Sequence, residues 1–599
     1  MGSAKGLGLR SSATGAPRRR SILPRSLLAC LVGLASWVTV LPSGARNVDT
    51  PGRSVSATEQ SRPNVLVFVT DDQRADGTLD AMPKTRSWFE EGGTRFHNAF
   101  ATTTLCCPGR ASIFTGRYAH NHGIRTNGGW DLIQQLDQRS TLQRYLKDAG
   151  YRTALVGKYF YSWNRSVPPP FVDDWALTGG GYHNAHFVVN GRGQTVPYST
   201  DFVADQAVGF LEAFDTNDGQ PWFLYVGTNA PHMEANPEAV YAASSVPSWE
   251  GNPAVFEADQ GDKPPWVRTY TSKYGDTFEQ VLEVRREQLR TLMSVDDLVG
   301  GVFETLQRLG EDRDTLAFFL SDNGYMWGEH GLGTDKRFPY TEAVEIPFLM
   351  RWPGHIPAGV VDHRMVANID VLPTVLQATG LSADPAFPVD GHSLLLPRRR
   401  ERLLLEYWRS PDGGPPGWAS IGDDTFQYIE WYSDDATTVT FREYYNLVAD
   451  PWQLQNLLGD ADPANDPNVA ALSALLAQHR DCVGPPCSPL VDLQAKTVVL
   501  KAHPNAVVPG KKTTLRGTVS PCPGHEGNPI EFQRRPRKGG RKVWRTTAIK
   551  PSDKDCTAQV RRKVTRTTDF RAISPADLDH LLGTSNVVKV RAKEVVTRR

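Results

Sequence analysis

Carboxylates follow two stretches of the sequence that have the composition of buried strands. Asp71 and Asp72 come directly after the apolar run Asn64–Thr70, and Asp322 and Asn323 follow the run "TLAFFLS". Oxygen ligands of this kind favour a hard divalent ion such as Ca²⁺ or Mg²⁺ over zinc, and such an ion would offset the cost of burying adjacent carboxylates. The alternative interpretation is turn and cap chemistry, which also favours Asp and Asn.

Two adjacent cysteines, Cys106 and Cys107, are the next unusual feature. Neighbouring cysteines rarely form a disulfide with each other, because disulfide geometry does not suit adjacent residues. Pro108 and Arg110 follow them, which gives the spacing Cys-x-Pro-x-Arg from Cys106. No serine lies in a G-x-S-x-G elbow that could act as a nucleophile. We therefore expect at least one of the two cysteines to have a chemical role.

Cationic side chains occur near the ends of other predicted strands. Lys158 follows a strand and a glycine, His232 lies in "APHMEANP", and Lys336 lies in "GTDKRFPY". Each of them alone is better interpreted as a surface or structural residue. Gathered with Arg110 at one edge of a sheet, they would neutralise a bound oxyanion and its developing charge. Such a set with a metal ion suits phosphoryl or sulfuryl transfer.

The pattern of strands and helices predicts that these residues do meet. Short apolar runs typical of buried strands are "NVLVFVT", "RTALVGKY", "PWFLYVGTNAPH" and "TLAFFLSDNG". Helical patterns occur in "TRSWFEEG", "TLQRYLKDAG" and "LRTLMSVDDLVGGVFETLQRLG". Strands that alternate with helices indicate an α/β sheet covered on both faces. The site of such a sheet lies beyond the carboxyl ends of its strands.

The Cys-x-Pro-x-Arg spacing resembles the signature of the sulfatases, a family of the alkaline-phosphatase superfamily. Further segments resemble this family in the same order, among them "VTDDQRADG", "VGKYFY", "SVDDLVGGVF", "LSDNGYMWGEHGL" and "ANIDVLPTVLQATG". The resemblance covers residues 62–487. The double cysteine and "GRYAHNHG" are most similar to the N-acetylglucosamine-6-sulfatase and heparan-type branch.

The resemblance implies a role for each candidate residue. A formylglycine-generating enzyme would oxidise Cys106 to formylglycine, whose hydrate attacks sulfur with one hydroxyl and expels sulfate with the other. Cys107 is then interpreted as a small buried hydrophobe. The implied Ca²⁺ ligands are Asp71, Asp72, Asp322, Asn323 and the modified Cys106. Arg110 would hold the diol, Lys158 and Lys336 the sulfate oxygens, and His232 would protonate the leaving alcohol.

The chain departs from the family pattern at two positions. Many sulfatases have Ser where this chain has Gly109, although Cys106, Pro108 and Arg110 of the signature remain. Many also have a His two residues after the Lys, where this chain has Phe160. A contact to the diol is then missing, or another residue supplies it. His120 and His122 are given no role, because a hydrogen-bonded loop histidine explains each equally well.

The domain organisation predicted from the sequence has four parts. Residues 1–45 read as a signal peptide, residues 62–400 as the catalytic α/β domain, residues 401–490 as a small α+β subdomain, and residues 491–599 as an Ig-like β-sandwich. The last part carries 24 Lys and Arg against 9 Asp and Glu, although the whole chain has no net charge. We expect this basic part either to bind an anionic polymer such as a sulfated glycan or wall polymer, or to be a solvated spacer. Nucleic acid is not expected as a partner of an exported protein.

Export is predicted from the N-terminus. An arginine cluster precedes an apolar run and small residues near Ala45, as in secretory signals, and the twin-arginine route remains open. The alternative, a membrane anchor, needs about 20 apolar residues, more than this run has. We expect no membrane span and a secreted protein in which two cysteine pairs, Cys482 with Cys487 and Cys522 with Cys556, can oxidise.

These observations predict a secreted, calcium-dependent sulfuric-ester hydrolase that acts on a sulfated sugar such as 6-O-sulfated N-acetylglucosamine. One alternative is a phosphodiesterase or phosphonate hydrolase of the same superfamily. Another is a catalytically silent scaffold whose basic domain binds a glycan or wall polymer.

Overall fold

The strand β1 (Asn64–Thr70) is the first element of the computed structural model, which describes residues 62–217, 219–411, 413–493, 497–520, 529–536, 544–574 and 583–592. The predicted signal peptide, residues 1–45, lies outside these residues, as does Cys522 of the second cysteine pair. All seven residues of β1 are buried, as the apolar run predicted.

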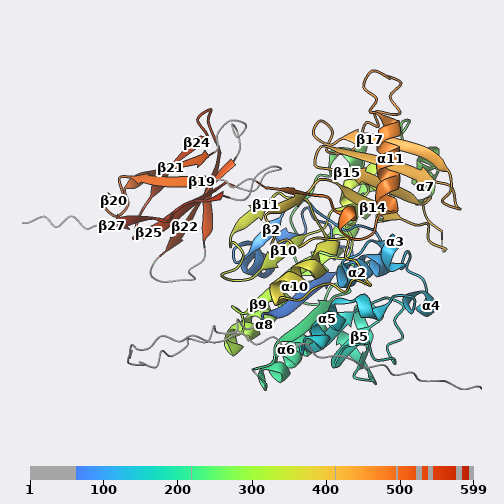
Figure 1. Cartoon of the computed structure of the whole chain (residues 1–599), viewed down its shortest axis with the longest axis horizontal. Coiled ribbons are helices and arrows are strands. Elements are labelled where there is room, and N and C mark those ends of the chain that lie inside the picture. The colour runs from blue at the N-terminus through green and yellow to red at the C-terminus, as the bar shows by residue number, and fades with distance from the viewer. Residues whose placement is uncertain are drawn as a thin grey trace, which may run out of the picture. The chain divides into compact units, whose positions relative to one another are not determined.

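A 10-stranded mixed sheet forms the centre of the main domain (Figure 1). Its middle consists of parallel strands in the order β9 (Thr315–Ser321), β1, β8 (Trp222–Gly227), β4 (Arg152–Lys158) and β5 (Asp174–Thr178). On one side follow β10 (Phe348–Arg351), β2 (Thr94–Phe96) and β11 (Val360–Asp362). On the other side follow β6 (His183–Val189) and β7 (Arg192–Tyr198). The four strands predicted from the sequence are β1, β4, β8 and β9.

Helices cover both faces of this sheet, as the sequence predicted. Val65, Val67 and Val69 pack into one core with α2 (Cys106–Thr115), α5 (Leu142–Asp148) and α10 (Val371–Thr379). Leu66 and Phe68 point to the other face, where they pack with α6 (Ser199–Asp215) and α8 (Phe278–Leu309). This alternation is the two-residue period of a strand buried on both sides.

One predicted helix differs in detail. The segment "TRSWFEEG" was expected to form a single helix, but a short α1 (Pro83–Thr85) runs into a wider turn at Arg86–Glu90. Trp88 and Phe89 of this turn are buried in the core of the second face. This wider turn therefore places both rings in the core, where Trp88 stacks on Phe303 of α8.

A smaller four-stranded antiparallel sheet follows the main sheet in the chain. It consists of β14 (Leu403–Tyr407), β15 (Trp418–Gly422), β16 (Phe426–Tyr432) and β17 (Val439–Asn446), and α11 (Val469–Arg480) packs on it. The predicted disulfide between Cys482 and Cys487 is present. After the disulfide, β18 (Leu490–Asp492) lies antiparallel to β13 (Arg398–Arg400).

The C-terminal region is β-rich and has its own core. One sheet consists of β19 (Thr497–His503), β21 (Lys512–Ser520) and β24 (Thr557–Lys563). A second sheet includes β22 (Pro529–Pro536), β23 (Arg545–Pro551), β25 (Thr568–Ser574) and β27 (Val588–Ala592). Leu515 of the first sheet and Phe532 of the second belong to one buried cluster. An Ig-like order of these strands stays a prediction. Within the described part of the chain, no helix has the length and apolar character to cross a membrane.

Candidate functional site

The carboxyl ends of the central parallel strands bring the candidate residues together. Asp71 and Asp72 follow β1, and Asp322 and Asn323 follow β9, whose Ser321 is the register partner of Thr70. Lys158 is the last residue of β4, and His232 lies in the loop after β8. Cys106 is the first residue of α2. The site therefore has the position that a parallel α/β sheet predicts.

Three carboxylates form the centre of the site. Oxygen atoms of Asp71, Asp72 and Asp322 lie within 4.8 Å of one another, and all three side chains are buried. Asn323 donates a hydrogen bond from Nδ2 to Asp72 Oδ1 over 2.8 Å, while its own Oδ1 is buried without a hydrogen-bond partner. The Asn323 oxygen without a partner and the three carboxylates together offer only oxygen ligands. This donor set fits a hard divalent cation such as Ca²⁺.

Three buried cations surround these carboxylates. Lys158 Nζ is paired with Asp71, and Lys336 Nζ with Asp72. Arg110 donates from Nε to Asp322 Oδ2 over 2.7 Å and from Nη2 to Asp71 Oδ2 over 3.2 Å. Every charge in the buried cluster therefore has an opposite charge in contact with it, as burial of charges requires.

The charges shift the ionisation of their neighbours. Burial opposes ionisation of Asp71, but Lys158, His232 and Arg110 outweigh it and hold its pKa far below the ordinary range. Burial also acts against the charged form of Lys158, yet Asp71 raises the pKa of this lysine. The pKa of Asp322 is raised, first by burial and then by the charge of Asp71. A divalent cation would favour the ionised form of all three carboxylates.

Cys106 lies inside this cluster, whereas Cys107 does not. Its Sγ is 3.3 Å from Asp71 Oδ1 and 3.0 Å from Lys336 Nζ. Burial, and then the charge of Asp71, raises the pKa of the Cys106 thiol, which keeps the unmodified side chain protonated and a weak nucleophile. Cys107 is fully buried within the apolar core of the first face, in agreement with its interpretation as a small hydrophobe.

His232 is the most exposed of the candidate side chains. Its Nε2 is 3.9 Å from Asp72 Oδ2, and its Nδ1 is hydrogen-bonded to the carbonyl oxygen of Met233. The side chain is 34% exposed, against 0–11% for the paired lysines, arginine and aspartates. Burial lowers the pKa of the imidazole, although Asp72 and Asp71 act in the opposite direction. Because the carbonyl of Met233 holds Nδ1, Nε2 is the ring nitrogen on the side of the Asp72 carboxylate.

One supporting residue was not predicted from the sequence. Tyr225, in β8, accepts a hydrogen bond from Arg110 Nη1 over 2.7 Å and donates one to the carbonyl oxygen of Lys158 over 3.0 Å. It fixes the guanidinium that bridges Asp71 and Asp322. The sequence did contain a signal for this residue. Tyr225 lies in the otherwise apolar run "WFLYVG", and a buried tyrosine hydroxyl needs a hydrogen-bond partner.

Both departures from the family pattern have a structural context. A Cβ atom added at Gly109 would lie 2.3 Å from the backbone oxygen of Asp322. Glycine therefore lets α2 approach the strand end that carries Asp322 and Asn323. Phe160 packs against Phe114 and Tyr159 in the apolar core, so it makes no polar contact to the site.

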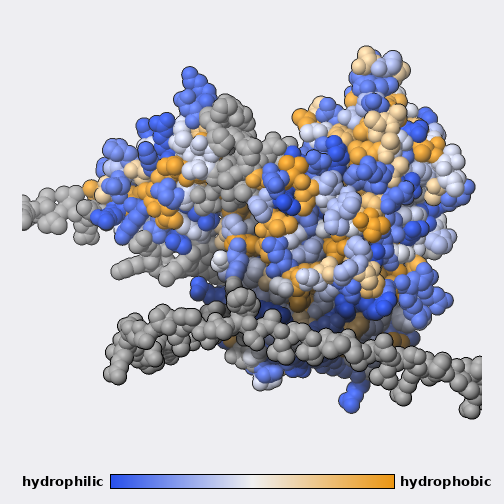
Figure 2. Space-filling model, in the orientation of Figure 1, coloured by the Kyte–Doolittle hydropathy of each residue, from blue (hydrophilic) through white to orange (hydrophobic). Residues whose placement is uncertain are grey.

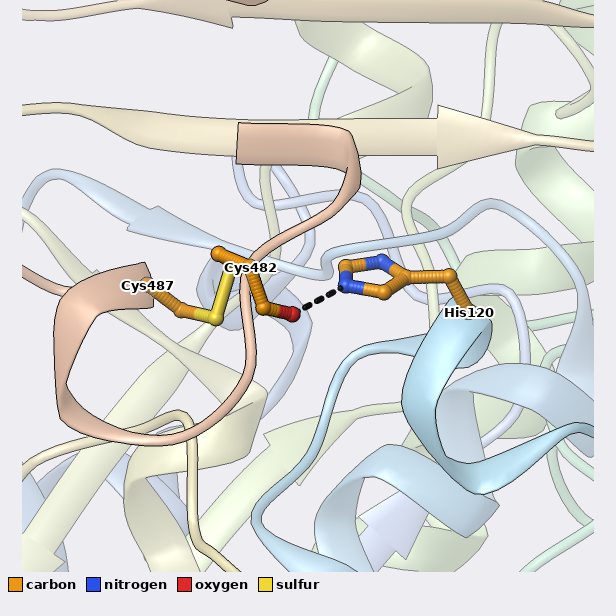
Figure 3. A group of neighbouring side chains, drawn as sticks. All are labelled: His120, Cys482 and Cys487. Carbon is orange, nitrogen blue, oxygen red and sulfur yellow. Dashed lines mark hydrogen bonds between the residues drawn. A yellow bond between two sulfur atoms is a disulfide. The ribbon is translucent and has the colours of Figure 1, made fainter. Parts of the chain in front are cut away.

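The two histidines near Cys106 are bound elsewhere. His122 is hydrogen-bonded through Nε2 to Ser112 Oγ, 3.1 Å away. His120 contacts Glu406 through Nδ1 at 2.9 Å and the carbonyl oxygen of Cys482 through Nε2 at 3.0 Å. Figure 3 shows its ring directed from α3 (Ala119–His122) at that carbonyl, beside the disulfide. The disulfide occupies both sulfur atoms, so this group holds the loop 482–487 rather than a metal.

Comparisons with known proteins identify the family. The sulfatase family model matches residues 63–381, and a model described as N-sulphoglucosamine sulphohydrolase, C-terminal, matches residues 328–481. The chain belongs to the sulfatase family, and its mixed sheet with helices on both faces is the alkaline-phosphatase-like fold of that family.

Individual relatives match over different shares of their length. The chain is 33% identical over 380 residues to the extracellular sulfatase SULF-1 homolog of Drosophila melanogaster, covering 59% of this chain but only 33% of that protein. It is 28% identical over 529 residues to N-acetylglucosamine-6-sulfatase of Homo sapiens, covering 79% of this chain and 92% of that protein. A protein solved in complex with its substrate D-glucosamine-2-N,6-O-disulfate has the same fold, with a TM-score of 0.59 and 23% identity over 70% of this chain and 98% of that one.

Proposed function

We propose that this protein hydrolyses sulfate esters of a sulfated sugar, with Ca²⁺ and a formylglycine derived from Cys106 at its centre. The observation that carries the proposal is the position of Cys106. Its sulfur is in contact with Asp71 and Lys336, inside the buried cluster of three carboxylates and three cations. Burial raises the pKa of this thiol, so the unmodified side chain is a poor nucleophile, and the chemistry would need the oxidised form of residue 106.

Charge balance supports an anionic substrate. The three carboxylates and three cations of the cluster cancel, so a divalent cation would leave two positive charges uncompensated. An anionic ester placed beside Lys158 and Lys336 would offset this excess. The same side chains would stabilise the charge that develops on the ester oxygens in the transition state.

The Ca²⁺ ligands would be Asp71, Asp72, Asp322, Asn323 and the modified residue 106. When bound, the ion supplies a Lewis acid that polarises a sulfate oxygen, and the aldehyde hydrate supplies one hydroxyl for attack and a second for release of sulfate. The maturation converts CH₂–SH to CHO with loss of sulfide. It is a two-electron oxidation that the formylglycine-generating enzyme would carry out with an external oxidant such as dioxygen.

The remaining residues would orient the diol and the sulfate group and would supply a proton. Arg110, fixed by Tyr225, would hold the diol next to Asp322 and Asp71. Lys158 and Lys336 would each bind sulfate oxygens. His232, the side chain open to solvent, would act in its imidazolium form: the Met233 carbonyl holds Nδ1–H, and Nε2–H is given to the leaving alcohol, which leaves the ring neutral.

The sugar and the location are part of the same proposal. A relative named N-acetylglucosamine-6-sulfatase supports 6-O-sulfated N-acetylglucosamine as the substrate, and one named extracellular sulfatase supports secretion through the N-terminal signal.

Parallel assays test the reaction class. The purified chain, produced together with a formylglycine-generating enzyme, is given an aryl sulfate and an aryl phosphodiester, followed by a panel of sulfated glucosamines. Release of sulfate, fastest from the 6-O-sulfated sugar, is the expected result. Faster phosphodiester or phosphonate cleavage would assign the site to those esters instead. No turnover of any ester by the modified protein would contradict the enzyme and leave a silent scaffold.

A further inference from the structure

The sheet of β19, β21 and β24 in the C-terminal region has one face that is unusually basic. On its inner face, alternate residues such as Val498, Leu515 and Val560 are buried in the core of this region. The residues between them point outward and are mostly exposed. Five outward side chains are cationic, and together they are called the basic face: Lys501, Lys512, Arg516, Arg561 and Lys563.

The register places like charges opposite each other on this face. Lys501 of β19 is the direct partner of Arg516 of β21, and Lys512 of β21 is the direct partner of Lys563 of β24. Cβ atoms of such cross-strand partners are about 4.5–5.5 Å apart, and like charges at this distance destabilise a sheet. The three strands contain no Asp or Glu that could compensate. In the turn before β24, Asp553 accepts hydrogen bonds from the backbone and hydroxyl of Thr557, and its charge also interacts with Arg516, so it offsets part of the positive charge there and none between Lys512 and Lys563.

Protection of edge strands does not explain this arrangement. Lysines on an edge strand discourage pairing with other chains. Here β21 lies between β19 and β24, and yet it carries Lys512 and Arg516. The five cationic side chains are exposed, so they are open to a ligand, and Figure 2 shows hydrophilic residues at the surface of this region.

We propose that the basic face binds a sulfated polysaccharide chain. A linear polyanion would replace the repulsion between opposing cations by attraction to several of them at once, which a small anion cannot do. The choice of a sulfated chain rests on the proposed function, because the polymer would then carry the ester that the catalytic site hydrolyses. The basic face itself is built from residues outside that site.

Binding of the full chain to immobilised heparin tests the proposal. In one variant, Lys501→Gln, Arg516→Gln and Lys563→Gln remove three charges from the basic face. In the matched control, Lys550→Gln, Lys589→Gln and Arg591→Gln remove three exposed charges from strands of the other sheet. The basic-face variant is expected to bind heparin at least tenfold more weakly, and the control within about twofold of the original chain. The affinity of the original chain should fall steeply with added NaCl.

Two outcomes would overturn the proposal. An equal loss in both variants would show that net charge alone drives binding. Equal affinity of the original chain for heparin and for polyglutamate or duplex DNA would assign the face to polyanions in general. Thermal unfolding checks that the variant folds, and it should unfold at an equal or higher temperature because repulsive pairs are removed. Sulfate release from a small aryl sulfate by the original chain tests the proposed function separately, whatever the heparin result.

Discussion

The buried cluster of three carboxylates and three cations differs from the basic face in how its positive charges are compensated. In the cluster, Lys158, Lys336 and Arg110 are buried, and each touches a carboxylate. On the basic face, Lys501 and Lys512 are exposed and stand opposite further cations. A buried charge must be compensated within the protein, whereas an exposed one is compensated by solvent, salt or a partner. The cluster therefore depends on its own residues, and the basic face is free to take its counter-charge from outside.

The largest expected effect concerns the cluster's chemistry. Cys106→Ala removes the proposed nucleophile and should lower kcat/KM for an aryl sulfate on the order of 10⁴-fold or more. Cys106→Ser should form a sulfate ester once and then stop, because it has no second hydroxyl to expel sulfate. Rapid-quench measurement of released alcohol separates these outcomes. Sustained turnover by Cys106→Ala would reject the nucleophile.

The next effect concerns stability of the buried charges. Asp71→Asn leaves Lys158 and Arg110 without full compensation and should lower the free energy of unfolding by about 3–5 kcal/mol. The matched control is Asp297→Asn, which removes the partner of Lys84 from a pair about half exposed, where about 0–1 kcal/mol is expected. Denaturant titration measures both. Equal losses in the free energy of unfolding for the two variants would contradict the difference expected between buried and exposed ion pairs.

A smaller effect depends on pH. Burial opposes protonation of His120, but the hydrogen bond and charge of Glu406 outweigh it and raise its pKa. Because the folded pKa lies above the unfolded value of about 6.5, the stabilisation is full below that value and is lost as pH rises through the folded pKa. His120→Gln should therefore cost about 1–3 kcal/mol at acid pH and less at alkaline pH. Unfolding curves across this range measure the difference; a gap that widens with pH would contradict the sign.

The smallest effect concerns the basic face. Lys512→Gln removes one like-charge pair with Lys563 and should raise the free energy of unfolding by about 0.2–1 kcal/mol at low salt. The gain should shrink in high salt, where the repulsion is screened. A destabilised variant would mean that Lys512 has a structural partner and that the face is less repulsive than its register indicates.

Much of the fold could be predicted from the sequence, and so could the meeting of the candidate residues at one edge of the sheet. Buried runs such as Asn64–Thr70 and the acidic pairs at their ends located the parallel strands and the edge where Asp71 and Asp322 meet. The pairing of Lys158 with Asp71 could not be predicted, because it depends on the order of strands across the sheet. The role of Tyr225 could not be predicted either, because its hydrogen-bond partner Arg110 is distant in the sequence and only the fold brings them together.

Other features depend on packing that no local pattern reports. The turn at Arg86–Glu90 carries Trp88 and Phe89 into the core, and β18 pairs with β13 across a long separation in the chain. The close approach of Gly109 to the carbonyl of Asp322 explains a glycine that the sequence showed only as a departure. The opposing cations of the basic face became visible only with the register of β21.

Mass spectrometry of the peptide that contains Cys106 tests the central claim most directly. In catalytically active protein, the account predicts that residue 106 has exchanged its sulfur and two hydrogens for one oxygen, while Cys107 remains a thiol. Active protein that contains only the unmodified thiol at residue 106 would contradict it.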